Sequence, residues 1–199
     1  MATSINRRSA NPRIGKRAQR GFSLIEVMIS MVILTVGLIS LLGVFGLAMA
    51  STQTSQQDMI AKQLANEALE SIVTARNTSQ IGWDAIQNIS GSCPSASGPI
   101  FMSGVQPIYL AGADGIIGTC DDANAQTLQS PGPDGIFGNS DDVSIPLSNF
   151  QRTIDILPVV DSNHNVISSV RAINITIQYS TTTRLPKSYV LSSFISQYQ

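Results

Sequence analysis

The hydrophobic positions of this 199-residue chain begin with a long uninterrupted run. Residues 27–50 contain no charged side chain, and a bilayer crossing needs about 20 apolar residues. Because every backbone amide inside hydrocarbon must find a local partner, we expect this run to form a helix. The sequence therefore predicts a transmembrane helix near the start of the chain.

A second pattern follows at residues 58–76, where there is no glycine or proline and good helix formers are frequent. Apolar pairs recur every four positions, which indicates a helix with one apolar face. We predict one helix from about residue 22 to residue 76, apolar on all sides over 22–50 and amphipathic over 51–76. The apolar pairs are Ile60/Ala61, Leu64/Ala65, Ala68/Leu69 and Ile72/Val73.

The last third of the chain changes to the alternating pattern of half-buried strands. Residues 152–160, 166–179 and 189–195 are rich in β-branched and aromatic side chains, whereas residues 77–103 have the composition of a loop. Strands at about 150–197 after one long helix predict an α+β fold, with an antiparallel sheet packed on the apolar face of the helix. Residues 77–199 would then form one globular head.

The distribution of charge adds a direction to this layout. Six of the twelve Lys and Arg residues lie in the first 20 positions, where there is no acid. Residues 22–199 hold six basic and thirteen acidic side chains, a net charge of −7, which excludes a basic nucleic-acid-binding body. Because a basic flank stays on the cytoplasmic side, we expect a single-pass protein of the inner membrane whose head is exported.

Glu26 is the unusual residue of the apolar segment. A carboxylate costs about 2.5–3.5 kcal/mol at the centre of a bilayer, and less near its edge, so it normally has a cationic partner. A plain signal anchor leaves Glu26 unexplained. A cleavable secretory signal is the other open interpretation, since Ala48-Met49-Ala50 looks like its small-residue cleavage site.

Gly21-Phe22-Ser23-Leu24-Ile25-Glu26-Val27, after a basic leader and before the apolar run, resembles the type III signal of type IV pilins and pseudopilins. The resemblance implies that a prepilin peptidase cuts after Gly21, removes the leader at 1–21 and N-methylates Phe22. Glu26 would then be an assembly residue that neutralises the Phe22 amine of a neighbouring pilin or pseudopilin subunit, because an unpaired buried charge is strongly disfavoured.

An acidic repeat occupies the middle of the head. Residues 112–122 recur as residues 132–142, with seven of eleven positions identical. Two glycines in each copy allow the chain to fold back, so that three carboxylates converge, and Ca²⁺ suits such a set of oxygens. A structural Ca²⁺ is one hypothesis, and capping of turns by the same carboxylates is the other. The candidate ligands are Asp114, Asp121, Asp122, Asp134, Asp141 and Asp142.

The two cysteines, Cys93 and Cys120, lie on the exported side, where an oxidising compartment favours a disulfide. Closing a loop of this length would stabilise the fold by ~3.5 kcal/mol in the chain-entropy account. There is no C-x-x-C motif, so redox catalysis is not expected. With a single histidine, His164, and no nucleophile-elbow motif, we do not expect an enzyme or a catalytic cofactor.

Within the family, residues 26–43, 67–70 and 189–192 most resemble minor pilins of the V kind. That resemblance implies a subunit for assembly or initiation of a type IV pilus, in support of motility, adhesion or DNA uptake. Two alternatives remain open. One is a pseudopilin of a type II secretion system, and the other is a membrane-anchored adhesin or calcium-stabilised binding module.

Overall fold

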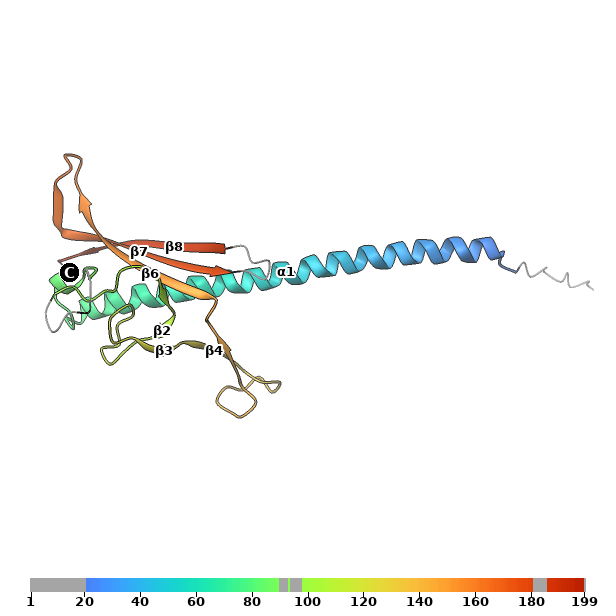
Figure 1. Cartoon of the computed structure of the whole chain (residues 1–199), viewed down its shortest axis with the longest axis horizontal. Helices are drawn as coiled ribbons and strands as arrows, with labels where there is room; N and C mark the ends of the chain where they lie inside the picture. Colours follow the sequence, from blue (N-terminus) through green and yellow to red (C-terminus); the bar gives the residue numbers. More distant parts are fainter. Residues whose placement is uncertain (1–20, 90–92, 94–97, 181–185, 199) are drawn as a thin grey trace, which may run out of the picture. The chain divides into compact units, whose positions relative to one another are not determined.

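A computed structural model describes residues 21–89, 93, 98–180 and 186–198 (Figure 1). The chain divides into two compact units, Met1–Leu47 and Ala48–Gln199. The basic leader, apart from Gly21, lies outside the described residues.

One helix, α1, runs from Leu24 to Asn77 and confirms the long helix that the sequence predicts. All residues from Gly21 to Met49 are exposed. Within the described residues, α1 is the one helix that is long and apolar enough to cross a membrane. The helix starts where the Ser23 carbonyl accepts hydrogen bonds from the amides of Glu26 and Val27, at 3.0 and 3.2 Å.

The main sheet follows the helix in the chain and is antiparallel throughout, in the order β1-β6-β7-β8. This confirms the α+β fold class. The three long strands pair in register, so that Ile154, Ile175 and Leu191 lie side by side across the sheet. The strands are β1 (Gln106–Pro107), β6 (Phe150–Val160), β7 (Val166–Ser180) and β8 (Pro186–Ser196).

The core of the second unit forms where the apolar face of α1 meets this sheet. Three of the six buried helix residues from Leu64 to Ala75 have the small side chain of alanine, which lets a strand approach the helix closely. On the sheet side, Ile173, Ile175 and Ile177 are 0% exposed. Burying each such isoleucine contributes about 1.5–3 kcal/mol. The buried helix residues are Ala61, Leu64, Ala65, Ala68, Ile72 and Ala75.

Polar contacts fix both ends of this helix–sheet interface. Near its start, the Tyr179 hydroxyl donates to Asp58 Oδ1 at 2.6 Å, and burial raises the pKa of Tyr179 to about 12. At the far end, Arg76 in the last turn of α1 donates to the carbonyls of Ser196 and Tyr198, at 2.5 and 2.6 Å. The helix is therefore tied to the residues at the end of β8.

Several short elements were not predicted from the sequence. They comprise a single helical turn, η1, and two small antiparallel hairpins, β2-β3 and β4-β5. Their strands have two to four residues and are mostly exposed, so they carry no alternation of apolar and polar positions. The bounds are η1 (Trp83–Ala85), β2 (Tyr109–Leu110), β3 (Ala123–Ala125), β4 (Thr127–Ser130) and β5 (Val143–Pro146).

The disulfide between Cys93 and Cys120 is present, which confirms the expected pairing. It joins residues 27 positions apart. Cys120 belongs to the first copy of the acidic repeat, so the disulfide holds that copy to the segment that follows α1.

The two copies of the acidic repeat close the two small hairpins. We call residues 112–122, between β2 and β3, the first acidic loop, and residues 132–142, between β4 and β5, the second acidic loop. Both begin with the same turn, in which the amide of Gly115 or Gly135 donates to the carbonyl of Gly112 or Gly132, at 3.1 and 3.0 Å. Only the first loop contributes to the core, through Ile116 and Ile117.

A matched pair of glycines tests this difference in packing. Gly118 and Gly138 hold equivalent positions with φ of +90° and +94°. A Cβ on Gly118 would lie 2.4 Å from Cδ1 of buried Ile154, whereas one on Gly138 would meet nothing within 4 Å. We expect Gly138→Ala to lower the free energy of unfolding by about 1–2 kcal/mol through backbone strain alone.

Gly118→Ala should cost about 1–3 kcal/mol more than Gly138→Ala, because the methyl group overpacks the core. Urea unfolding of the detergent-solubilised chain, followed by the fluorescence of Trp83, its single tryptophan, measures both values. Equal losses would show that the first acidic loop does not pack against Ile154.

Candidate functional site

The first candidate site is the start of α1, which carries the residues of the expected processing signal. Gly21 and Phe22 directly precede the helix, and the Phe22 side chain is 83% exposed. Glu26 lies in the first turn, where the partial positive charge of the helix end favours a carboxylate by about 0.3–1 kcal/mol. That contribution is smaller than the cost of placing the carboxylate in hydrocarbon.

Glu26 is the only charged residue between positions 21 and 57. Within the described part of the chain it forms no ion pair. Since a carboxylate at the edge of hydrocarbon needs a cation, its partner must be a group other than these side chains.

The other polar side chains of the apolar run satisfy themselves. Ser30, Thr35 and Ser40 are its only polar residues, and each hydroxyl donates to a backbone carbonyl three or four residues earlier in the helix. Hydroxyls bonded in this way need no water. Residues 27–50 are therefore compatible with hydrocarbon on every side, and Glu26 is the group that breaks this pattern.

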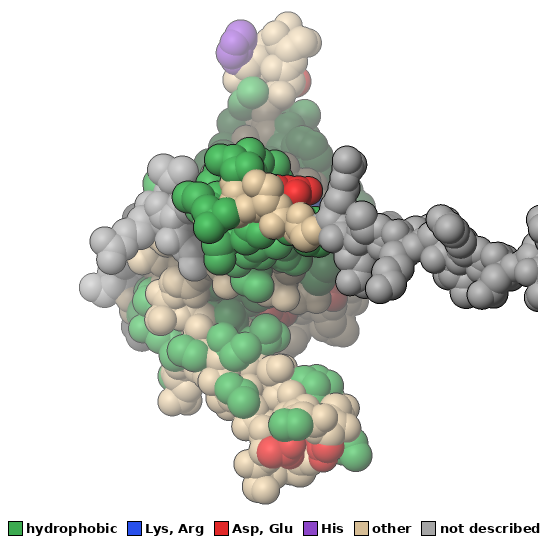
Figure 2. Space-filling view, turned by 90° about the vertical axis from the view of Figure 1, so that its right-hand side faces the viewer, with side chains coloured by type: hydrophobic (Ala, Val, Ile, Leu, Met, Phe, Trp, Pro, Cys, Tyr) green, Lys and Arg blue, Asp and Glu red, His purple; other side chains and the backbone are tan. Residues whose placement is uncertain are grey.

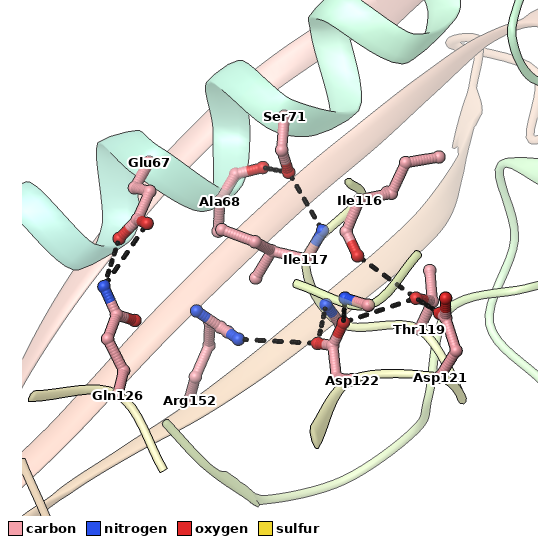
Figure 3. Close-up of polar contacts among 12 residues, drawn as sticks. Glu67, Ala68, Ser71, Ile116, Ile117, Thr119, Asp121, Asp122, Gln126 and Arg152 are labelled. Atoms are coloured by element: carbon pink, nitrogen blue, oxygen red, sulfur yellow. Dashed lines mark hydrogen bonds and ion pairs between the residues drawn. The ribbon is translucent and has the colours of Figure 1, made fainter. Parts of the chain in front are cut away.

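The second candidate site is the first acidic loop, whose carboxylates bind backbone amides (Figure 3). Asp114 Oδ1 accepts from the Ile116 amide at 2.8 Å. Asp122 Oδ2 accepts from the Gly118 amide at 2.7 Å. Thr119 donates its hydroxyl hydrogen to Asp121 Oδ1 at 2.7 Å. These are the contacts of turn capping.

Arg152 on β6 lies next to this loop (Figure 3) and was not singled out by the sequence analysis. Its side chain is 2% exposed, and its Nη2 atom is 3.9 Å from Asp122 Oδ2. Burial raises the pKa of Asp122, against the effect of the amides of Gly118 and Gly112 and the charge of Arg152. Burial also lowers the pKa of Arg152. The pair thus offsets part of the cost of burying both charges.

Further contacts join the first acidic loop to α1. The Ile117 amide donates to Ser71 Oγ at 3.3 Å, and Gln126, just past β3, donates to both carboxylate oxygens of Glu67. The loop is therefore a part of the helix–sheet interface. A signal for this network exists in the sequence, because Arg152 stands at an inward position of the alternating strand.

The second acidic loop repeats the turn-capping contacts in solvent. Asp134 Oδ1 accepts from the Ile136 amide at 2.9 Å, and Asp142 Oδ2 accepts from the Gly138 amide at 2.6 Å. Asn139 adds a hydrogen bond to Asp134 Oδ2 at 2.6 Å. Among the described residues, no group of three or more His, Cys, Asp or Glu side chains is placed to hold a metal ion. Calcium binding by the six aspartates stays a prediction.

His164 lies in the turn between β6 and β7, with φ of +64° and an exposed side chain. Trp83 packs against the edge of the core, where its indole N–H donates to the Ser168 carbonyl and its ring lies 4.3 Å from the Arg171 guanidinium carbon. Neither residue is placed next to a nucleophile in the contacts described above.

Comparison with known proteins found one family model that matches the chain, the prokaryotic N-terminal methylation motif, at residues 16–42. No curated protein and no solved structure matches the chain. The matched residues include Gly21, Phe22 and Glu26, and the motif is the type IV pilin signal. It implies processing by a prepilin peptidase and assembly with other pilins, and it fits a structural subunit anchored in the inner membrane. By this signal, the chain belongs to the type IV pilin and pseudopilin family.

Proposed function

We propose that this protein is a minor pilin, a structural subunit that takes part in assembly or initiation of a type IV pilus. The observation that carries the proposal is Glu26, a lone carboxylate in the first turn of an exposed apolar helix that directly follows Gly21-Phe22. The matched methylation motif covers this segment. A soluble role leaves the exposed apolar surface of α1 unexplained, because large exposed apolar patches mark interaction sites.

Processing changes the charge at the start of α1 in the way that assembly requires. Hydrolysis of the Gly21–Phe22 peptide bond releases the leader with its six basic residues and leaves an amine on Phe22. The basic leader holds the chain on the cytoplasmic side, so its removal frees the helix to leave the bilayer. The new amine, which remains protonated after methylation, is the one cation that processing creates next to Glu26.

Pairing of this amine with Glu26 of an adjacent subunit would set the register between helices. Two unit charges 4 Å apart attract by about 4 kcal/mol at an effective dielectric constant of 20. Because any other register leaves a charge unpaired in a low-dielectric bundle, the pair contributes specificity more than affinity. Glu26 acts here as an assembly residue.

The assignment to a pilus rests on the resemblance of residues 26–43, 67–70 and 189–192 to minor pilins of the V kind. Deletion of the gene separates this assignment from its alternatives. Loss of surface pili with normal secretion supports the minor pilin, whereas normal pili with lost secretion would identify a pseudopilin. Filaments that never contain the protein would favour an anchored adhesin or binding module.

Calcium remains part of the proposal as a structural ion. Each acidic loop contains three aspartates on a turn fixed by glycines, and carboxylate and carbonyl oxygens are the ligands that Ca²⁺ takes. The ion would hold loops that contain few apolar side chains of their own.

Gly21→Ala tests the cleavage site. We expect the variant to keep its leader, because the peptidase would no longer find its glycine. On a denaturing gel it should run as a precursor about two kilodaltons heavier than the wild type (~110 Da per residue). Gly37→Ala, at a position of α1 where an added Cβ meets nothing within 4 Å, is the matched control and should be processed normally. A normal mature band from Gly21→Ala would contradict the assignment.

Glu26→Val tests the pairing. The variant should insert into the membrane, because valine is apolar, but its amount in sheared filaments should fall at least about tenfold through loss of one buried charge pair. The same replacement at Glu70, an exposed residue in the second half of α1, should leave incorporation unchanged. Incorporation of Glu26→Val at the wild-type level would refute the role given to this carboxylate.

Chelation tests the calcium proposal. Saturating Ca²⁺ at about 100 times its dissociation constant adds about 2.7 kcal/mol of stability, which corresponds to a rise in Tm of roughly 5–10 °C for a chain of this size. Differential scanning calorimetry of the full chain in EGTA, Ca²⁺ or Mg²⁺ measures the shift. Equal Tm values in all three buffers would leave turn capping as the sole role of the aspartates.

A further inference from the structure

The two acidic loops share a backbone and differ in what surrounds their apolar side chains. In the first loop, Ile116 and Ile117 are 1% and 4% exposed. In the second, the equivalent Ile136 and Phe137 are each 63% exposed. We call Ile136 and Phe137 the apolar tip; Figure 2 shows hydrophobic and acidic side chains together at the end of the β4-β5 hairpin. The same scaffold is thus packed in one place and without a described partner in the other.

The first loop shows what kind of surface this scaffold packs against. Its Ile116 and Ile117 enter an apolar core, and Gly118 lies against Ile154. Beside them, Asp122 faces the guanidinium of Arg152. The complement of the scaffold is therefore an apolar surface that carries an arginine next to the acidic side of the loop.

The second loop does not find this complement in its own hairpin. Residues 127–146 contain three aspartates and no lysine or arginine. Asp142 stands at the position of Asp122, and its Oδ1 atom is buried without a hydrogen-bond partner in the described part of the chain. The apolar tip and the acids next to it are both left to be matched by another surface.

A surface of the required chemistry lies on the same head. A groove of about 330 Å³ runs between the ends of β6 and β7 and has the guanidinium-bearing Arg171 in its wall. Leu157 and Val166 in its lining are 48% and 61% exposed, and Pro158 and Ile167 extend the apolar surface.

Arg171 is held in a fixed place at this groove. Its Nη1 atom donates to the carbonyls of Trp83 and Ile86, and the guanidinium lies over the Trp83 ring. Asp84 is its acidic neighbour and offsets part of its charge. Even so, the groove offers a cation beside apolar side chains, whereas the second acidic loop offers apolar side chains beside three acids.

We propose that the apolar tip of one subunit docks into the β6-β7 groove of a second copy of this chain, with the aspartates of the loop facing Arg171. The proposal rests on the proposed function, since it requires neighbouring subunits in a filament. Because loop and groove are different surfaces of one head, the contact is heterologous and continues from subunit to subunit instead of closing into a dimer. That geometry suits a filament.

Cross-linking between two differently tagged full-length chains tests the contact in the native membrane. One chain carries Ser140→Cys, in the second acidic loop, and the other carries Ser168→Cys, at the rim of the groove. A short bismaleimide should give a band with both tags. Ser192→Cys, an exposed position on β8 outside the groove, replaces Ser168→Cys in the matched control and should give none.

Adding Ile136→Ser and Phe137→Ser to the Ser140→Cys chain should lower the cross-linked fraction at least about tenfold, because two apolar side chains no longer leave water. Both side chains are exposed, so the fold should persist, and the unchanged Tm of this variant is the check. Cross-linking that survives these substitutions would overturn the docking, as would dimers of Ser140→Cys alone, which indicate a loop-to-loop contact.

The sheared filament fraction separates the two proposals. Wild-type protein present in filaments without the Ser140–Ser168 cross-link would overturn the docking and leave the pilin function standing. Protein absent from filaments and without the cross-link would overturn both. A cross-link within one chain would show that the groove is filled by its own loop, which also overturns contact between copies.

Discussion

One helix must satisfy two different surroundings, and this constraint organises the whole protein. Over residues 24–49 α1 is apolar and exposed on all sides, so it requires lipid or other apolar helices around it. From Ala61 to Ala75 the same helix buries a narrow stripe against a sheet. The change from one regime to the other takes place without a break in the helix, and the head is built on the second regime alone.

The exposed half of α1 tolerates few polar atoms. Its three hydroxyls are bonded within the helix, which leaves Glu26 as its single charge. In such surroundings one carboxylate can determine how subunits align, because no other polar group competes for a cation. The methylation motif that covers Glu26 and the exposure of α1 therefore point to the same conclusion by independent routes.

The sequence was sufficient to predict those elements whose residues repeat with the period of the structure. The four-residue spacing from Ile60 to Val73 predicted the buried face of α1, and the alternation from Ile173 to Tyr179 predicted the inward side of β7. The disulfide followed from the compartment and the number of cysteines. The processing residues followed from a local motif that needs no knowledge of the fold.

Tertiary context decided the rest. Strands of two to four residues, as in β2 and β4, are too short to show a period. The two acidic loops have nearly the same sequence, yet Ile116 is buried and Ile136 is exposed, because only the first loop is placed against α1. The pairing of Arg152 with Asp122 joins residues 30 positions apart and depends on that same placement.

The link from Arg76 to the carbonyls of Ser196 and Tyr198 has a mechanical consequence. Tension applied along α1 would reach the head at the last turn of the helix, where this link transfers it to β8. The load then acts along strands whose ladder hydrogen bonds lie across the direction of pull and share it as shear. The loops and small hairpins stay outside this path, so the head can bear force while its surface changes freely.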